Sequence, residues 1–184
     1  MKEAVIIYFS NTGNTKKVAE AVYAGLKEEN FNVEMKDVQK LDDIDFFDYD
    51  LVCIGTPSYS WMPPEPMQNF LEKKFTQYEE QGYVKLKAPK VEGRNALIFC
   101  TYSGPHTGKK EAVPAVKYIG QFFEHLGFKI LAEWYILSEM VGSKKYSTQG
   151  KMGDIRGLPS QKDLQEIKEK TKKVADILAI ADLL

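Results

Sequence analysis

Hydrophobic and polar positions follow two alternating patterns along this chain. Three short, continuous apolar runs, at residues 4–9, 51–55 and 96–101, predict strands covered on both faces. Residues 32–38 alternate between apolar and polar side chains, which is typical of a half-exposed edge strand. Residues 128–137 predict a fifth strand, with three side chains on one of its faces: Ile130, Ala132 and Trp134.

Between these runs, apolar side chains recur at helical spacing. Helices are predicted over residues 16–29, 63–74 and 111–126, and from a cap at Ser160 onward, where Asp163 completes a capping box. In each helix one set of side chains is expected to face inward. In the order of the four helices, these sets are Val18, Ala19, Val22 and Leu26; Met67, Phe70 and Leu71; Val113, Val116, Ile119, Phe122, Phe123 and Leu126; and Leu164, Ile167, Val174, Ile177 and Leu178.

Five strands alternating with helices predict an α/β fold with three layers. The sheet is expected to be doubly wound, five-stranded and parallel, because helical crossovers join parallel strands. The polar second strand fits an edge position, which favours the strand order 2-1-3-4-5. Ligands of such sheets bind outside the carboxyl ends of the strands, where the order reverses between strands one and three. A length of 184 residues predicts one domain, 1–184.

The loop after the first strand has the composition of an anion site. Its residues are Ser10, Asn11, Thr12, Gly13, Asn14 and Thr15. Unpaired backbone N–H groups at the start of the following helix favour a phosphate, the hydroxyl groups add donors, and Gly13 permits a close turn. The loop contains no Lys or Arg, so it suits a single terminal phosphate; an ordinary capped helix is the alternative. Neither the P-loop pattern nor the dinucleotide glycine pattern is present.

Two further loops are expected at the same edge of the sheet. The loop after the third strand contains Thr56, Pro57, Ser58, Tyr59, Ser60 and Trp61. The loop after the fourth strand contains Thr101, Tyr102, Ser103, Gly104 and His106. Both combine aromatic and small polar residues, which suits the stacking of an aromatic ring whose polar edge is bound by the loop backbone.

Charge and composition limit the kinds of partner and the location that can be expected. The formal net charge is −1, so neither nucleic acid nor an anionic membrane is an expected partner. No apolar run approaches the roughly 20 residues of a membrane span, and none near Met1 has the form of a leader, so a cytoplasmic protein is expected. Cys53 and Cys100 are predicted to be reduced and buried, and the spacing of the two histidines predicts no metal site.

The three loops together resemble the flavodoxin-like FMN-binding proteins. The match at residues 10–15 is close, whereas the matches at residues 55–57 and 101–108 are looser. The resemblance implies that residues 10–15 hold the phosphate of FMN and that the other two loops flank its isoalloxazine ring. Tyr59, Trp61 and Tyr102 are then the stacking candidates. Carrier flavodoxins are typically acidic and many have a Gly in the second loop; this chain is nearly neutral and has none between Thr56 and Trp61.

Two functions remain open at this point. The first is an electron carrier that exchanges electrons with redox partner proteins. The second is an NAD(P)H-dependent reductase of quinones or another small electron acceptor. Residues 138–159, which follow the fifth strand, either cover the flavin or contact a second subunit of a homodimer. His106 either binds the flavin edge, relays a proton or is solvated. A signalling receiver is disfavoured, because the first loop lacks paired acidic residues.

Overall fold

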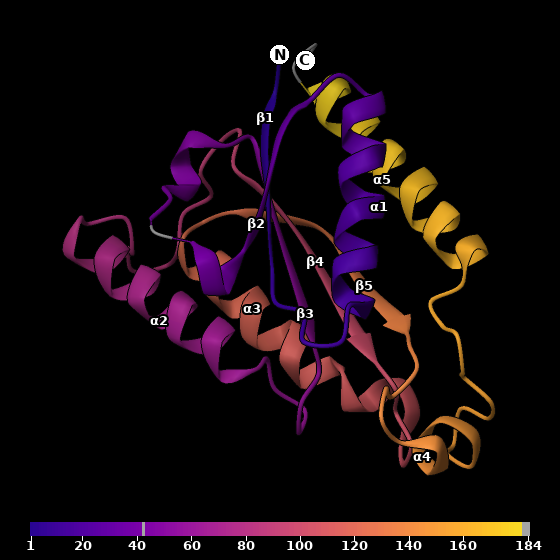
Figure 1. Cartoon of the computed structure of the whole chain (residues 1–184). Helices are drawn as coiled ribbons and strands as arrows, with labels where there is room; N and C mark the ends of the chain where they lie inside the picture. Colours follow the sequence, from indigo (N-terminus) through magenta and orange to yellow (C-terminus); the bar gives the residue numbers. More distant parts are fainter. Residues whose placement is uncertain (42, 182–184) are drawn as a thin grey trace.

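The five predicted strands form one parallel sheet in the computed structural model, which describes residues 1–41 and 43–181. The strand order is β2-β1-β3-β4-β5, as predicted (Figure 1). The strand bounds are β1 Glu3–Tyr8, β2 Asn32–Asp37, β3 Leu51–Pro57, β4 Asn95–Tyr102 and β5 Lys129–Leu137. Thr56, Pro57 and Tyr102 therefore belong to strands, although the sequence placed them in loops, because β3 pairs with β4 as far as Pro57 and β4 pairs with β5 as far as Tyr102. Thr101, at the end of the predicted strand 96–101 and the start of the predicted loop, is also part of β4.

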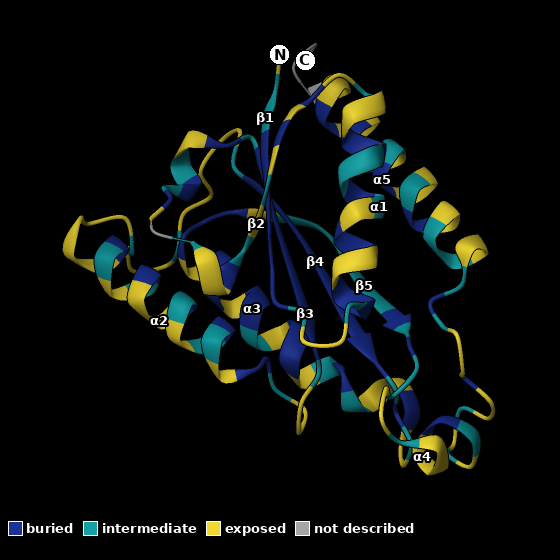
Figure 2. Ribbon diagram, in the orientation of Figure 1, coloured by how far each residue is buried: buried dark blue, intermediate teal, exposed yellow. Residues whose placement is uncertain are grey.

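Helices cover both faces of the sheet and make it the middle of three layers. On one face lie α1 (Asn14–Glu28) and α5 (Gln161–Ala181), which pack against each other. On the other face lie α2 (Glu65–Glu80) and α3 (Val113–His125). Figure 2 shows the three central strands, β1, β3 and β4, almost wholly buried, the two edge strands β2 and β5 only partly buried, and the outer sides of the helices exposed. Each face of the sheet therefore has its own hydrophobic cluster.

The first and last helices follow their sequence patterns closely. The predicted inner face of α1 is buried throughout, and the capping box before α5 is formed: Asp163 accepts from the backbone N–H of Ser160 at 2.7 Å. In return, the hydroxyl oxygen of Ser160 accepts from the N–H of Asp163. The prediction for Ile177 is wrong, since 51% of it is exposed. It lies beside the stripe formed by Ile167, Val174 and Leu178, at the edge of the contact between α5 and α1.

Helix α2 is longer than its apolar pattern predicts. It begins at Glu65, after the two prolines, and continues to Glu80, so the beginning of the expected loop at residues 75–94 is helical. The added turns carry Tyr78, which is fully buried; helix α2 ends just before Gly82, whose φ is 78°. The third helix starts two residues later than predicted: a 3₁₀ turn, η3 (Gly108–Glu111), precedes it, and Pro114 occupies its first turn.

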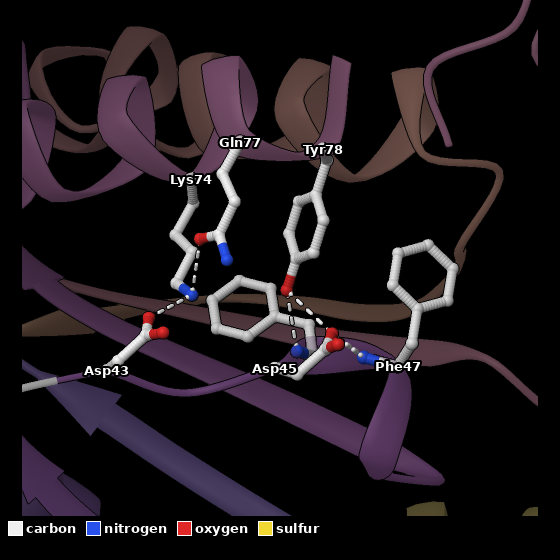
Figure 3. A network of polar contacts seen from close by, with 7 residues as sticks. Asp43, Asp45, Phe47, Lys74, Gln77 and Tyr78 are labelled. Atoms are coloured by element: carbon white, nitrogen blue, oxygen red, sulfur yellow. Dashed lines mark hydrogen bonds and ion pairs between the residues drawn. The ribbon is translucent and has the colours of Figure 1, made fainter. Parts of the chain in front are cut away.

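A polar network with two buried members, Lys74 and Tyr78, holds the segment between β2 and β3 against α2 (Figure 3). The ammonium of Lys74, only 2% exposed, contacts Asp43 Oδ1 at 2.6 Å and lowers the pKa of that carboxyl group. The Tyr78 hydroxyl accepts from the backbone N–H of Phe46 at 2.6 Å and donates to Asp45 Oδ1 at 3.1 Å. Burial raises the pKa of Tyr78. These partners are distant in sequence, which explains why local periodicity misses the last turns of α2.

The fifth strand contains a bulge that changes the predicted side-chain pattern. Ala96 pairs with Ile130, whereas the next residue of β4, Leu97, pairs with Ala132. Leu131 is therefore an extra residue, and the alternation of faces reverses there. Ile130 packs in the cluster beneath α2 and α3, while Ala132 and Trp134 pack in the cluster beneath α1 and α5. The prediction that these three side chains share one face is wrong.

Two other expectations can be compared with the structure. Cys53 and Cys100 are free and buried, as predicted, and burial raises the pKa of the Cys100 thiol to about 12. Within residues 1–41 and 43–181, no helix is both long enough and apolar enough to cross a membrane.

Candidate functional site

A cavity of about 300 Å³ opens at the carboxyl ends of β1, β3 and β4, where the strand order reverses. Most of the residues predicted to form a site line it: Ser10, Asn11, Thr12, Asn14, Thr15, Pro57, Ser58, Tyr59, Ser60, Trp61, Thr101, Tyr102, Ser103, Gly104 and His106. The two that do not are Gly13, which shapes the first loop, and Thr56, which is fully buried in β3. The structure therefore brings the three predicted loops together.

The first loop forms a turn that directs backbone donors at the cavity. Gly13 precedes α1 with φ at 94° and ψ at −17°, a left-handed conformation that suits glycine. The hydroxyl oxygen of Ser10 accepts from the N–H groups of Gly13 and Lys16, both at 3.2 Å. Asn14 and Thr15 open the helix, so their N–H groups have no intrahelical acceptor. The first turn of α1 contains no acidic residue, and this donor set fits a phosphate.

A buried hydroxyl pair joins the first loop to the third. Thr15 Oγ1 and Thr101 Oγ1 are 2.8 Å apart, and both residues are nearly inaccessible to solvent. One hydroxyl donates to the other, which leaves the second proton for another acceptor. This contact fixes the start of α1 against the end of β4, so a ligand phosphate would meet a positioned set of donors.

The second loop contains a tight turn with an uncommon backbone. Tyr59 and Met62 exchange two backbone hydrogen bonds, of 2.9 and 3.0 Å, around Ser60 and Trp61. Ser60 has φ at 46° and Trp61 has φ at 70°, so both central residues are left-handed. Turns of this kind normally use Asn and Gly, because other side chains cost about 1–2 kcal/mol there. This strained turn places Trp61, which is 61% exposed, at the mouth of the cavity.

The three aromatic candidates occupy different depths. Tyr59 is 44% exposed, contacts Phe9 edge to face at 6.4 Å between ring centroids, and hydrogen-bonds to Asn11. Burial raises the pKa of Tyr59, and the Asn11 contact acts in the opposite direction. Tyr102 is only 8% exposed and is part of the core, so it forms a wall of the cavity. The exposed rings free to stack on a planar ligand are thus Tyr59 and Trp61.

The third loop is held by a carboxylate that the sequence did not single out. Glu111 Oε1 accepts from the backbone N–H groups of His106 and Thr107, at 2.8 and 2.5 Å. Its backbone oxygen accepts from the Ser58 hydroxyl at 2.5 Å, which connects the second and third loops. His106 is exposed, and its ring meets that of Tyr146 edge to face at 5.8 Å.

Residues 138–159 form another wall of the cavity. They contain a short helix, α4 (Lys144–Thr148), and contribute Ser138, Glu139, Met140 and Tyr146 to the lining. The segment is tied down at two points: Asn14 Nδ2 donates to the Glu139 carbonyl oxygen at 3.0 Å, and the Lys151 N–H donates to the Pro105 carbonyl at 2.8 Å. The sequence analysis identified the segment but none of these lining residues. The one sequence feature that indicated a place near the cavity was that the segment follows the carboxyl end of the fifth strand.

Comparison with known proteins agrees with this geometry. The fold is a doubly wound α/β fold, and its cavity lies at the switch point, where ligands of such sheets bind. The family model described as flavodoxin matches residues 6–170, and the chain belongs to the flavodoxin family.

The similar proteins include both an enzyme and flavodoxins. An NAD(P)H dehydrogenase (quinone) of Archaeoglobus fulgidus is 23% identical, over 96% of this chain and 97% of its own length. The flavodoxin-like domain-containing protein BilS of Clostridioides difficile is 42% identical over 55 residues, 29% of this chain and 30% of its own. Flavodoxin 1 of Bacillus cereus superposes with a TM-score of 0.65 at 14% identity, covering 95% of this chain and 97% of that one. The structural likeness supports the fold.

Proposed function

We propose that this protein binds FMN in the cavity and carries electrons between redox partners. The observation that carries the proposal is the first loop: residues 10–15 are uncharged and rich in hydroxyls, and they lead into a buried helix start whose N–H groups have no intrahelical acceptor, which fits the terminal phosphate of FMN. Ser10, Thr12 and Thr15 would hold the phosphate, and Tyr59 and Trp61 would cover the ring. Bound FMN would supply one- and two-electron transfer; the chain's own residues bind and orient it.

A second candidate is an NAD(P)H-dependent reductase of quinones. It is favoured by one observation, the match over nearly the full length of both chains to a protein named for that activity. A reductase needs space for a second ligand beside the flavin. Residues 138–159 bound the cavity on the side of His106 and Tyr146, where such a ligand would lie.

An anaerobic titration of the FMN-loaded protein separates the two functions. The carrier is expected to be reduced by dithionite and to pass electrons to ferricyanide, with no sustained NADH or NADPH oxidation when a quinone is added. Rapid steady-state oxidation of either nucleotide by the protein alone would establish the reductase instead. A protein that stays colourless and takes up no FMN would contradict both.

Replacement of Thr15 by Ala is expected to weaken FMN binding. The change removes one donor at the phosphate position and leaves the buried Thr101 hydroxyl without its 2.8 Å partner. A lost hydrogen bond to a charged group is worth about 1.5–3 kcal/mol, so the dissociation constant should rise by about tenfold or more. Fluorescence quenching during FMN titration measures it. Thr15→Ser keeps the hydroxyl and should bind nearly as the parent does; equal loss in both variants would assign the effect to packing.

Trp61→Gly is expected to weaken FMN binding without lowering the stability of the fold. Glycine adopts the φ of 70° without strain, so the free energy of unfolding without flavin should stay equal or rise by about 1 kcal/mol. FMN affinity should fall about tenfold, because a stacking ring is lost. Lys87→Gly is the matched control: Lys87 has φ at 68° and does not line the cavity, so only stability should change. Unchanged FMN affinity in Trp61→Gly would show that the ring does not cover the flavin.

A further inference from the structure

Four exposed lysines lie beside the cavity mouth, outside the residues that line it. They are Lys110 of η3, Lys144 and Lys145 of α4, and Lys151, and together they are called the lysine rim. The segment after α4 is joined to the loop before η3, since the Lys151 N–H donates to the Pro105 carbonyl at 2.8 Å. Carbon atoms of the Lys151 side chain also lie 3.7 and 4.0 Å from the position that a Cβ on Gly108 would take. In Figure 1, α4 lies beyond the carboxyl ends of β4 and β5.

The ammonium groups of the rim have no carboxylate partner within residues 1–41 and 43–181. The carboxylates of the adjoining segments are engaged elsewhere. Glu111 accepts from the backbone of the third loop, and Glu139 Oε2 accepts from the Gly157 N–H at 2.8 Å. Asp154 pairs with Arg156, which lowers the pKa of Asp154 to about 2. Hydrogen bonds from backbone N–H groups leave Glu111 and Glu139 charged, so four lysines stand against two carboxylates without an ion pair, and this side of the cavity keeps a net positive charge.

The rim makes the charge around the cavity uneven, although the whole chain has a formal net charge of only −1. The first turn of α2, which follows the Tyr59–Met62 turn, carries Glu65 instead. A one-sided positive field beside a cavity attracts and orients an anionic partner, and its effect falls with ionic strength. The asymmetry points to recognition of negative charge on the α4 side.

We propose that the lysine rim is the docking surface for an acidic redox protein that exchanges electrons with the flavin. This inference rests on the proposed function. The rim suits a large partner better than a small anion inside the cavity, because none of its lysines lines the cavity. It also offers flexible point charges, and the neighbouring Arg156, which could form a planar fork to a phosphate, is already paired. Electrostatic steering of a protein surface needs only such a spread of exposed charge.

The test measures electron transfer from the FMN-loaded, dithionite-reduced protein to two small haem proteins of opposite charge. Acidic cytochrome b5 and basic cytochrome c each take one electron per ferric iron, so the two-electron-reduced flavin reduces two equivalents of either. The rate constant with cytochrome b5 is expected to fall about tenfold or more from low to near-physiological ionic strength. The rate constant with cytochrome c should rise or stay level over the same range.

Charge variants locate the docking surface. Replacing Lys144, Lys145 and Lys151 together by Gln should lower the cytochrome b5 rate constant about tenfold at low salt, with FMN affinity unchanged. The control removes the same charge at exposed lysines distant from the cavity lining, Lys27, Lys85 and Lys173. Its rate constant should change less than about twofold.

Three results would overturn the inference. One is a cytochrome b5 rate constant that is independent of salt, and another is an equal loss in the rim and control variants. The third is a rim variant with an unchanged cytochrome rate and a raised KM for NADPH, which would assign the rim to a nucleotide. Binding of cytochrome b5 to the immobilised chain at low salt needs no flavin. It tests the rim even if FMN does not bind, and FMN titration of each variant tests the proposed function separately.

Discussion

Replacing Gly13 by Val is expected to abolish FMN binding nearly completely. Gly13 has φ at 94°, a conformation that a β-branched residue adopts only at a cost of about 1–3 kcal/mol, so the turn before α1 would rearrange. The N–H groups of Asn14 and Thr15 would then no longer converge on the phosphate. We expect the dissociation constant to rise by about a hundredfold or more, since several charge-assisted hydrogen bonds are lost together. Titration of the flavin-free protein, followed by fluorescence, measures it.

The control for this change is Gly82→Val. Gly82 has φ at 78°, and, as at Gly13, no described atom other than those of the glycine and its two chain neighbours lies within 4 Å of the position that a Cβ would take. It follows the end of α2, far along the chain from the cavity lining. The two variants should lose similar stability, but only Gly13→Val should lose FMN. If Gly82→Val lost FMN to the same extent, the effect would come from general destabilisation rather than from the first loop.

Gly55→Ala is expected to destabilise the sheet beneath the cavity. A Cβ at Gly55 would lie 2.2 Å from two ring carbons of Phe99, which pairs with it on β4. Phe99 is fully buried, so the ring cannot move aside without disturbing the core. The free energy of unfolding should fall by about 1–3 kcal/mol, measured by urea denaturation.

A double-mutant cycle identifies the clash. Phe99→Leu removes the ring, so the cost of Gly55→Ala should be at least about 1 kcal/mol smaller in that background. Gly120→Ala serves as a control in α3, because its nearest neighbour would be 3.5 Å away; that change should be neutral or stabilising by about 0.5–1 kcal/mol. Strict additivity of Gly55→Ala and Phe99→Leu would show that the two residues do not compete for space.

Local patterns were sufficient for the strand order and for the position of the first loop. The polar second strand indicated the edge and so the strand order, and the position of residues 10–15 after the first strand was enough to place them at the cavity. Both features are determined by residues that lie close together in the sequence. The inner face of α1 was also predictable, because helical spacing and burial coincide there.

Features set by distant contacts were missed. The last turns of α2 depend on the network of Lys74 and Tyr78 with the segment before β3. The reversal of faces in β5 follows from one extra residue, Leu131, that periodicity cannot locate. Within the site, the left-handed Ser60 and Trp61 contradict local preference, as strained turns at binding sites do. Glu139 reaches the cavity only because residues 138–159 fold back onto Asn14.

Binding of the FMN phosphate by the first loop is tested most directly by comparing FMN with riboflavin, which has the same ring and no phosphate. Each ligand is titrated into the flavin-free protein, and the dissociation constants are compared. FMN is expected to bind at one equivalent and riboflavin at least about a hundredfold more weakly, because the proposed contacts of the first loop are all with the phosphate. Equal affinity for the two flavins, or no uptake of FMN, would contradict binding of the phosphate by the first loop.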